Sequence, residues 1–162
     1  MKKILNVIDF ISKVGAYLSG VFMLLIVFLI CLEILLRTLF KTSTMISDEF
    51  SAYFMVFSVF LGLAYTLKEG KHIKITLITS RIRNKMVAKA VDLIVLIFAF
   101  GISVFVFCYS VSMVYETYSL DMRADSMLET PLWIPEMGVP IGFFLLSIQL
   151  ISMIIRRMKN YQ

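Results

Sequence analysis

The chain has few of the residues from which catalytic and redox sites are built. It contains one histidine, His72, and two cysteines, Cys31 and Cys108. A lone histidine excludes a haem with two axial histidines and leaves a zinc set incomplete, and such distant cysteines cannot form a Cys-x-x-Cys redox pair. Phosphate-binding loops, zinc-protease motifs and nucleophile elbows are missing as well. We therefore predict no enzyme, no catalytic residue, no metal site and no cofactor.

Charge is also scarce, because 17% of the 162 residues are charged and 60% are hydrophobic. The mean hydropathy of +0.91 leaves no room for a soluble domain beside the apolar segments, so residues 1–162 are predicted to form a single membrane domain. The second and third apolar runs have no ionisable residue at their centres. A protein that moves ions by itself normally retains such residues, because charge is costly in a bilayer.

Four long apolar runs are what the sequence does have. About 20 helical residues cross the hydrocarbon core, and each run has about 18 to 25. The first is too long for the apolar part of a signal peptide and lacks a cleavage site, so we expect it to be retained. The sequence thus predicts an all-α integral membrane protein with four transmembrane helices, at 14–36, 50–67, 91–115 and 137–155.

Basic residues lie almost entirely on one side of these runs. Only Arg37, Lys41 and Arg123 fall on the other side. Cytoplasmic loops carry an excess of Lys and Arg, so both termini are predicted to be cytoplasmic. The protein itself is predicted to lie in the inner membrane. The high sequence pI, near 9.3, is then explained by the membrane topology and by contact with anionic lipid headgroups. It does not indicate nucleic-acid binding. The basic residues of the predicted cytoplasmic side are Lys2, Lys3, Lys13, Lys68, Lys71, Lys74, Arg81, Arg83, Lys85, Lys89, Arg156, Arg157 and Lys159.

The segment 75–90 is too charged to cross the membrane. It has two parallel rows at four-residue spacing, one apolar (Ile78, Ile82, Met86) and one basic (Arg81, Lys85, Lys89). This pattern is typical of an interfacial amphipathic helix between the second and third spans, with its basic row binding lipid headgroups. A cytoplasmic helix packed on a partner would have the same pattern.

The outer ends of the first two spans carry the most informative polar residues. Glu33 and Arg37 are spaced to form an ion pair within one helix. The alternatives are a charged contact with another membrane subunit and a proton-coupling carboxylate. Ser47 is predicted to cap the second span, with Asp48 and Glu49 in its first turn. The acidic pair could also help to dock a partner from outside the cell membrane.

Turn and anchor residues mark other boundaries. Gly70 is predicted to end the second span and, with Lys71 and His72, to turn the chain onto the surface helix. In the acidic connection before the fourth span, Trp133 is predicted to anchor the outer interface and Pro135 to open the span. Small residues four apart predict close helix contacts, in the rows Ser12/Ala16/Gly20, Ser58/Gly62, Ala99/Ser103 and Gly138/Gly142.

Taken in order, several of these segments resemble one family. They are Asp48-Glu49, Phe60-Leu61-Gly62, Leu67-Lys68-Glu69-Gly70-Lys71-His72-Ile73-Lys74-Ile75 and Thr130-Pro131-Leu132-Trp133-Ile134-Pro135 with Gly142. With a first span ending in Glu33 and Arg37, this order is similar to the small membrane subunit of tripartite ATP-independent periplasmic (TRAP) transporters, the DctQ-like family. The resemblance covers about residues 5 to 158.

The resemblance implies a non-catalytic partner in secondary active transport. In that family a large membrane subunit carries the sodium and substrate sites, and a periplasmic substrate-binding protein delivers an organic acid such as a C4-dicarboxylate or sialic acid. The small permease subunit would brace the scaffold of the large one in the bilayer. Its partners would be the large subunit, the binding protein and membrane lipids.

Two other classes of function compete with this interpretation. One is an autonomous small transporter or exporter that uses Glu33 to couple to protons. The other is a membrane enzyme acting on lipid or quinone, for which no nucleophile, metal set or redox group is visible. The empty centres of the second and third runs weigh against the first alternative.

Overall fold

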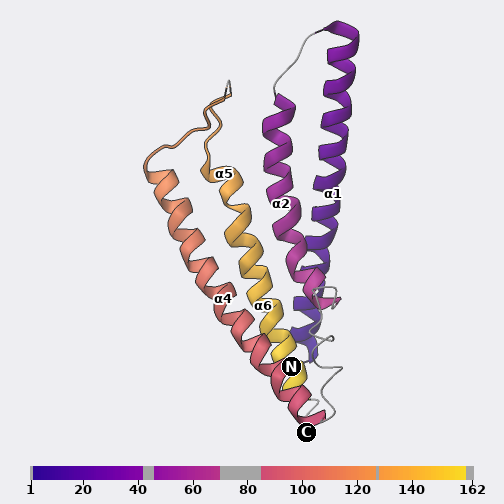
Figure 1. Ribbon diagram of the computed structural model, residues 1–162, viewed down its shortest axis with the longest axis vertical. Coiled ribbons are helices and arrows are strands. Elements are labelled where there is room, and N and C mark those ends of the chain that lie inside the picture. Colours follow the sequence, from indigo (N-terminus) through magenta and orange to yellow (C-terminus); the bar gives the residue numbers. More distant parts are fainter. Residues whose placement is uncertain (1, 42–45, 70–84, 127, 160–162) are drawn as a thin grey trace.

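The computed structural model describes residues 2–41, 46–69, 85–126 and 128–159 (Figure 1). Over these residues the chain is helical, as predicted, and its β-type pairing is one bridge between Arg123 and Pro131. The elements are α1 (Lys2–Phe40), α2 (Ile46–Lys68), α4 (Lys85–Ser119), α5 (Trp133–Glu136) and α6 (Gly138–Lys159).

Four stretches of helix are long and apolar enough to cross a membrane, which confirms the predicted class. Each extends beyond the apolar run from which it was predicted, because a helix does not have to end where the hydrocarbon ends. Residues 85–90, the end of the predicted interfacial helix, are the start of α4, whereas residues 75–84 lie outside the described part. The four stretches are Leu5–Phe40, Ile46–Lys68, Ala90–Ser119 and Trp133–Met158, the last combining α5 and α6.

The helices are arranged side by side in the order α1, α2, α6, α4 (Figure 1). The central helices α2 and α6 pack on each other, α1 packs mainly on α2, and α4 packs on α6. The helices converge where α1 begins and α6 ends and spread apart at the other end. We call these the terminal end and the distal end.

Glycine brings the central helices close together. A Cβ at Gly142 of α6 would lie 2.5 Å from the Phe60 carbonyl oxygen of α2. A similar approach joins α1 to α2, where a Cβ at Gly15 would lie 2.8 Å from the Leu61 carbonyl oxygen. The space left by a missing side chain is thus filled by the neighbouring backbone. Gly62 and Gly138 also contact neighbouring helices, Gly62 through the Ser19 side chain, as their predicted rows require.

The predicted small-residue row on the first helix is wrong in register. Ser12 contacts α6 as its place in the row predicts, but Gly20 has nothing within 4 Å of a built Cβ, and the contact face continues through Gly15 and Ser19 instead. This face follows spacings of three and four, because the helix repeats every 3.6 residues and a strict spacing of four drifts off the contact.

Serine hydroxyls bond directly between helices. Ser19 Oγ donates to the Ser58 carbonyl at 2.6 Å, and Ser58 Oγ donates to the Ser19 carbonyl at 3.0 Å, which joins α1 to α2. The hydroxyls of Ser103 and Ser147 lie 2.8 Å apart and join α4 to α6. Such contacts satisfy polar groups that lipid cannot satisfy.

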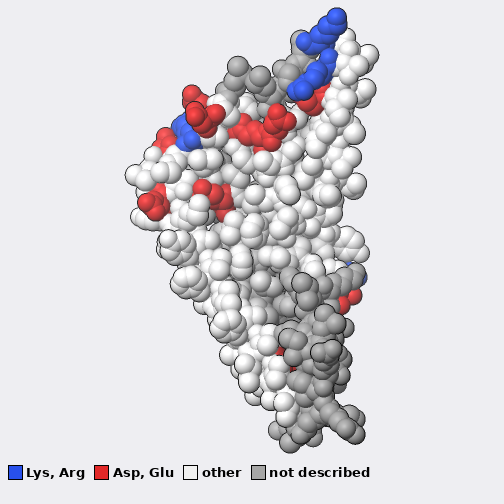
Figure 2. Space-filling view, in the orientation of Figure 1, with Lys and Arg blue, Asp and Glu red and all other residues white. Residues whose placement is uncertain are grey.

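Charge is absent from a broad middle band of the face in Figure 2, and acidic side chains gather above it toward the distal end. Large apolar side chains of the flanking helices are exposed, including Leu24 of α1 at 71% and Phe105 of α4 at 70%. A band of this kind is what a surface in contact with lipid or another membrane protein requires.

Candidate functional site

At the terminal end, the Asp9 carboxylate of α1 connects three helices. Arg156 of α6 donates to its Oδ2 at 2.7 Å, and the Lys68 Nζ of α2 lies 3.7 Å from the same oxygen. The buried Gln149 of α6 donates to Asp9 Oδ1 at 3.4 Å and accepts a hydrogen bond from Ser12 Oγ at 2.8 Å. We call Asp9, Ser12, Lys68, Gln149 and Arg156 the terminal tie.

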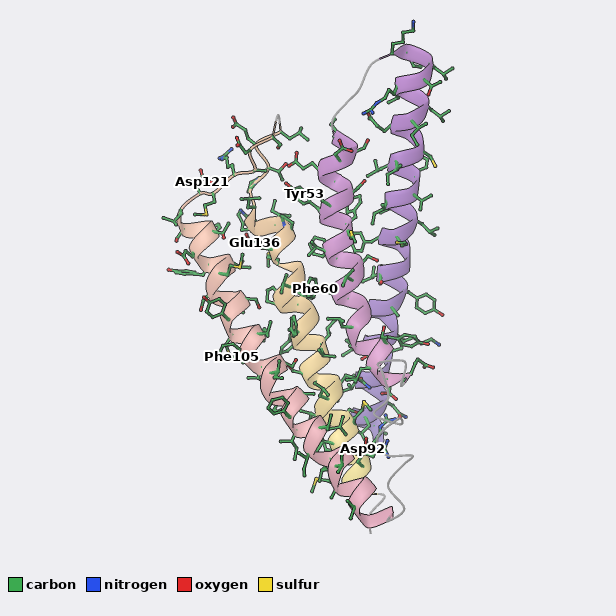
Figure 3. The ribbon with its side chains drawn as sticks, in the orientation of Figure 1. Tyr53, Phe60, Asp92, Phe105, Asp121 and Glu136 are labelled. Atoms are coloured by element: carbon green, nitrogen blue, oxygen red, sulfur yellow. The ribbon has the colours of Figure 1, made fainter. Side chains whose placement is uncertain are left out.

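A second ion pair at this end holds the remaining long helix. Arg157 Nη2 of α6 lies 3.1 Å from Asp92 Oδ2 of α4, and both side chains are partly exposed. Figure 3 shows Asp92 near the terminal end, where α4 and α6 converge. Consecutive arginines on α6 therefore contact different neighbours, Arg156 reaching α1 and Arg157 reaching α4.

At the distal end, Glu33 is almost fully buried between α1 and α2, with 7% of its surface exposed. Ser47 Oγ donates to Glu33 Oε2 at 3.0 Å, and Arg37 Nη2 lies 3.6 Å from Oε1. Ser47 does not precede its helix as the predicted cap, because α2 begins at Ile46 and the hydroxyl is turned toward α1. Glu33 thus bonds within its own helix and to α2.

A pocket of about 210 Å³ opens beside this carboxylate. It is lined by Ile30, Glu33, Ile34, Arg37, Thr38, Ser47 and Asp48, so one wall comes from α1 and the other from the start of α2. Ser47 is level with Glu33, and α1 continues to Phe40, so its last two turns project past the first residues of α2. We call this space the distal pocket.

The loop between α4 and α5 folds back toward the start of α2. Tyr53 Oη of α2 donates to Glu49 Oε1 at 2.5 Å, and the side chains of Ser126 and Thr130 lie beside the Glu49 carboxylate. The backbone of the loop pairs with itself, from Ala124 N to the Thr130 carbonyl at 2.9 Å. Figure 3 shows Tyr53 between α2 and this loop. Glu49 therefore takes part in a loop contact, and Asp48 stays exposed.

Trp133 and Pro135 lie in α5, the single turn that leads into α6. The Trp133 ring meets Tyr118 of α4 edge-on, with centroids 5.8 Å apart at 87°. Pro135 is buried, and Met137 separates α5 from α6. The indole thus joins the distal end of α4 to the start of the last span.

The other predicted site residues are not placed by the structure. Gly70, Lys71, His72 and Arg81 lie outside the described residues. Lys85 and Lys89 belong to the first turns of α4, and their side chains are not described. The turn and the headgroup-binding row therefore stay predictions.

The terminal tie and the Asp92–Arg157 pair were not predicted from the sequence. One signal was available, because Asp9 is an acidic residue on the side of the membrane where basic residues dominate, and Gln149 interrupts an apolar run. Buried polar groups need partners, so both residues indicate contacts with other helices. Arg156 lies 147 residues from Asp9 and Ser12 lies 137 residues from Gln149, so these partners could not be chosen without the fold.

Together these features define a multi-pass helical membrane protein whose polar groups pair at the two ends of its spans. No group of metal-binding side chains occurs within the described ranges. The family described as "Tripartite ATP-independent periplasmic transporters, DctQ component" matches residues 26–160. The chain belongs to this family and is a small permease subunit of a TRAP transporter of the inner membrane. No curated protein matches the chain.

Proposed function

We propose that this subunit braces the scaffold of the large membrane subunit during sodium-coupled, binding-protein-dependent uptake of an organic acid. The acid is of the C4-dicarboxylate or sialic acid type. In this role the chain moves no substrate itself. It widens the immobile part of the transporter and holds it upright in the bilayer.

The observation that carries this proposal is the pairing of polar side chains between α1 and α2, between α4 and α6, and between α1 and α6. Ser19 with Ser58, Ser103 with Ser147 and Ser12 with Gln149 each join two helices. A helix that moved during transport would have to break such bonds in lipid, where nothing replaces them. A bundle tied in this way suits a fixed frame.

The runner-up function is proton-coupled transport by this chain alone, with Glu33 as the carrier. Glu33 is the carboxylate that such a mechanism would use, and it is buried. However, Arg37 Nη2 lies 3.6 Å from Glu33 Oε1 and Ser47 donates to Oε2, so both carboxylate oxygens already have partners in α1 and α2. The geometry therefore supports a static contact between α1 and α2.

Orientation and further contacts form part of the proposal. α1 begins and α6 ends at the same end of the molecule (Figure 1), and the excess of Lys and Arg in the sequence segments on that side of the spans supports a cytoplasmic location for it. The distal end then faces the periplasm, where exposed Asp48 and the acidic loop are available to the substrate-binding protein. The basic row Arg81, Lys85 and Lys89 would bind lipid headgroups at the opposite face.

Transport in proteoliposomes tests the proposal. Three preparations are compared under a sodium gradient: this chain alone, this chain with the large membrane subunit, and that pair with the binding protein. We expect uptake only with the complete set. Glu33→Gln in the complete set should leave proton dependence unchanged. Uptake or efflux by the chain alone, abolished by Glu33→Gln, would establish the runner-up function instead.

A further inference from the structure

The walls of the distal pocket change from apolar to charged along α1. Ile30 lies at the deep end, Glu33 and Ile34 follow one turn later, and Arg37 follows after another turn. From Ile30 to Arg37 the helix rises about 10 Å. A phospholipid changes in the same direction over a similar distance, from acyl chain through phosphate to headgroup. The pocket therefore has the polarity gradient of a lipid at the membrane interface.

Ile30 and Ile34 also lie where a lipid can reach them. Their exposed fractions are 45% and 58%, although they border the pocket. At about 210 Å³ the pocket is smaller than sites for drug-sized ligands, which hold about 300 to 1,000 Å³. It suits a small polar group whose attached chain continues along the outside of α1.

The charged side chains of the pocket favour a ligand that carries both a positive and a negative charge. Glu33 and Asp48 supply two carboxylates against the single guanidinium of Arg37, so the lining is net negative and disfavours a free carboxylate or phosphate. Asp48 lines the pocket and is exposed, so its carboxylate is accessible to a cationic group. The Arg37 side chain is 65% exposed, so its guanidinium is accessible to a phosphate that approaches from outside the protein.

We propose that the distal pocket binds the headgroup of a zwitterionic phospholipid with a primary ammonium, namely phosphatidylethanolamine. Its phosphate contacts Arg37, its ammonium donates hydrogen bonds to Asp48, and its chain lies against Ile30 and Ile34. The ammonium distinguishes this lipid from phosphatidylcholine, whose quaternary nitrogen has no N–H to donate. This inference concerns the chain itself and does not depend on the proposed function.

Native mass spectrometry of the full chain tests the proposal, with three lipids of identical acyl chains supplied in turn. They are phosphatidylethanolamine, phosphatidylcholine and phosphatidylglycerol. We expect one retained phosphatidylethanolamine and a preference over the other two of at least about tenfold, since charge-assisted hydrogen bonds are lost with either. Equal retention of the three lipids would overturn the proposal.

Two variants assign that preference to the pocket. Asp48→Asn should reduce it to within about twofold of unity, because the contact with the ammonium is the one that distinguishes the lipids. Arg37→Gln should instead weaken the retention of all three lipids, because all three carry the phosphate. The matched controls are Asp121→Asn and Arg123→Gln, an exposed acid–arginine pair 3.2 Å apart at the same end but outside the pocket. They should keep the preference. Survival of the preference in Asp48→Asn, undiminished lipid retention in Arg37→Gln, or loss of the preference in the controls would contradict the assignment.

A second measurement distinguishes a lipid from a protein side chain as the occupant. A photo-crosslinking amino acid in place of Ile34 is introduced into the chain within the complete transporter in a membrane containing phosphatidylethanolamine. A crosslink to that lipid supports the proposal. A crosslink only to a protein subunit, or none to lipid, overturns it.

Discussion

The central helices α2 and α6 differ from the flanking helices α1 and α4 in length and in how their surfaces are packed. α2 and α6 have 23 and 22 residues, whereas α1 and α4 have 39 and 35. The central pair meets through Gly142 with no space for a side chain, and the flanking pair exposes large apolar residues along its length. Lipid is as apolar as leucine, so helices in a bilayer are held by close packing and polar bonds, not by hydrophobic burial. The central pair is therefore held by close packing at Gly142, the flanking helices are held by serine bonds and by the close approach at Gly15, and the outer faces of the flanks remain available to lipid or partner.

The largest effect should come from filling the contact between the central helices. In Gly142→Ala the new Cβ would lie 2.5 Å from a backbone oxygen of α2, so the helices must separate. We expect the free energy of unfolding to fall by about 3 kcal/mol. Unfolding in mixed micelles of increasing SDS content measures it.

The control for that change is Gly101→Ala on the flanking helix α4. Gly101 has nothing within 4 Å of a built Cβ, so the effect should stay within about 0.5 kcal/mol. Equal effects of the two substitutions would show that the central contact is not special.

The second effect compares the two ionic contacts of the terminal end. Asp9→Ala removes the carboxylate that Arg156 and Lys68 share and should cost about 2 kcal/mol, because two cations then lie close together without a counter-charge. Asp92→Ala breaks a partly exposed pair and should cost under about 1 kcal/mol. The same SDS titration measures both, and a reversed order would contradict the terminal tie.

Two phenylalanines give the next contrast (Figure 3). Phe60 of α2 packs on Phe143 of α6 with ring centroids 5.9 Å apart, and Phe105 of α4 is 70% exposed. Phe60→Ala should cost about 1 kcal/mol of packing energy in the isolated chain, and Phe105→Ala close to none. If α4 faces the large subunit, Phe105→Ala should instead lower the yield of the intact complex in a pull-down.

The smallest effect concerns the hydroxyl pair that joins α4 to α6. A double-mutant cycle with Ser103→Ala and Ser147→Ala should give a coupling energy of about 0.6 kcal/mol, the typical value for such bonds in membranes. The related pair Ser19 and Ser58, which also bond to each other's backbone carbonyls, provides the comparison. A coupling near zero at Ser103 and Ser147 would leave packing and the Asp92–Arg157 pair to hold α4.

Which helices cross the membrane could be predicted, because apolar length is a local property that the sequence states directly. The exact ends of the helices and the partners of their polar side chains were predicted less accurately. The first helix was expected to begin after Lys13, but it includes Asp9, whose charge is neutralised by residues of α2 and α6. Likewise Ser47 was expected to cap its own helix, and its hydroxyl instead bonds to Glu33 on α1. In both cases a contact between helices outweighed the local pattern.

The edge-on contact of Trp133 with Tyr118 has an optical consequence. Trp133 is the only tryptophan of the chain, so its emission reports from one place, where α4 meets α5. Binding of a partner or a lipid that moves the distal end of α4 would change the surroundings of that indole and shift its fluorescence spectrum. The subunit therefore carries an intrinsic probe with which assembly can be followed in real time without any attached dye.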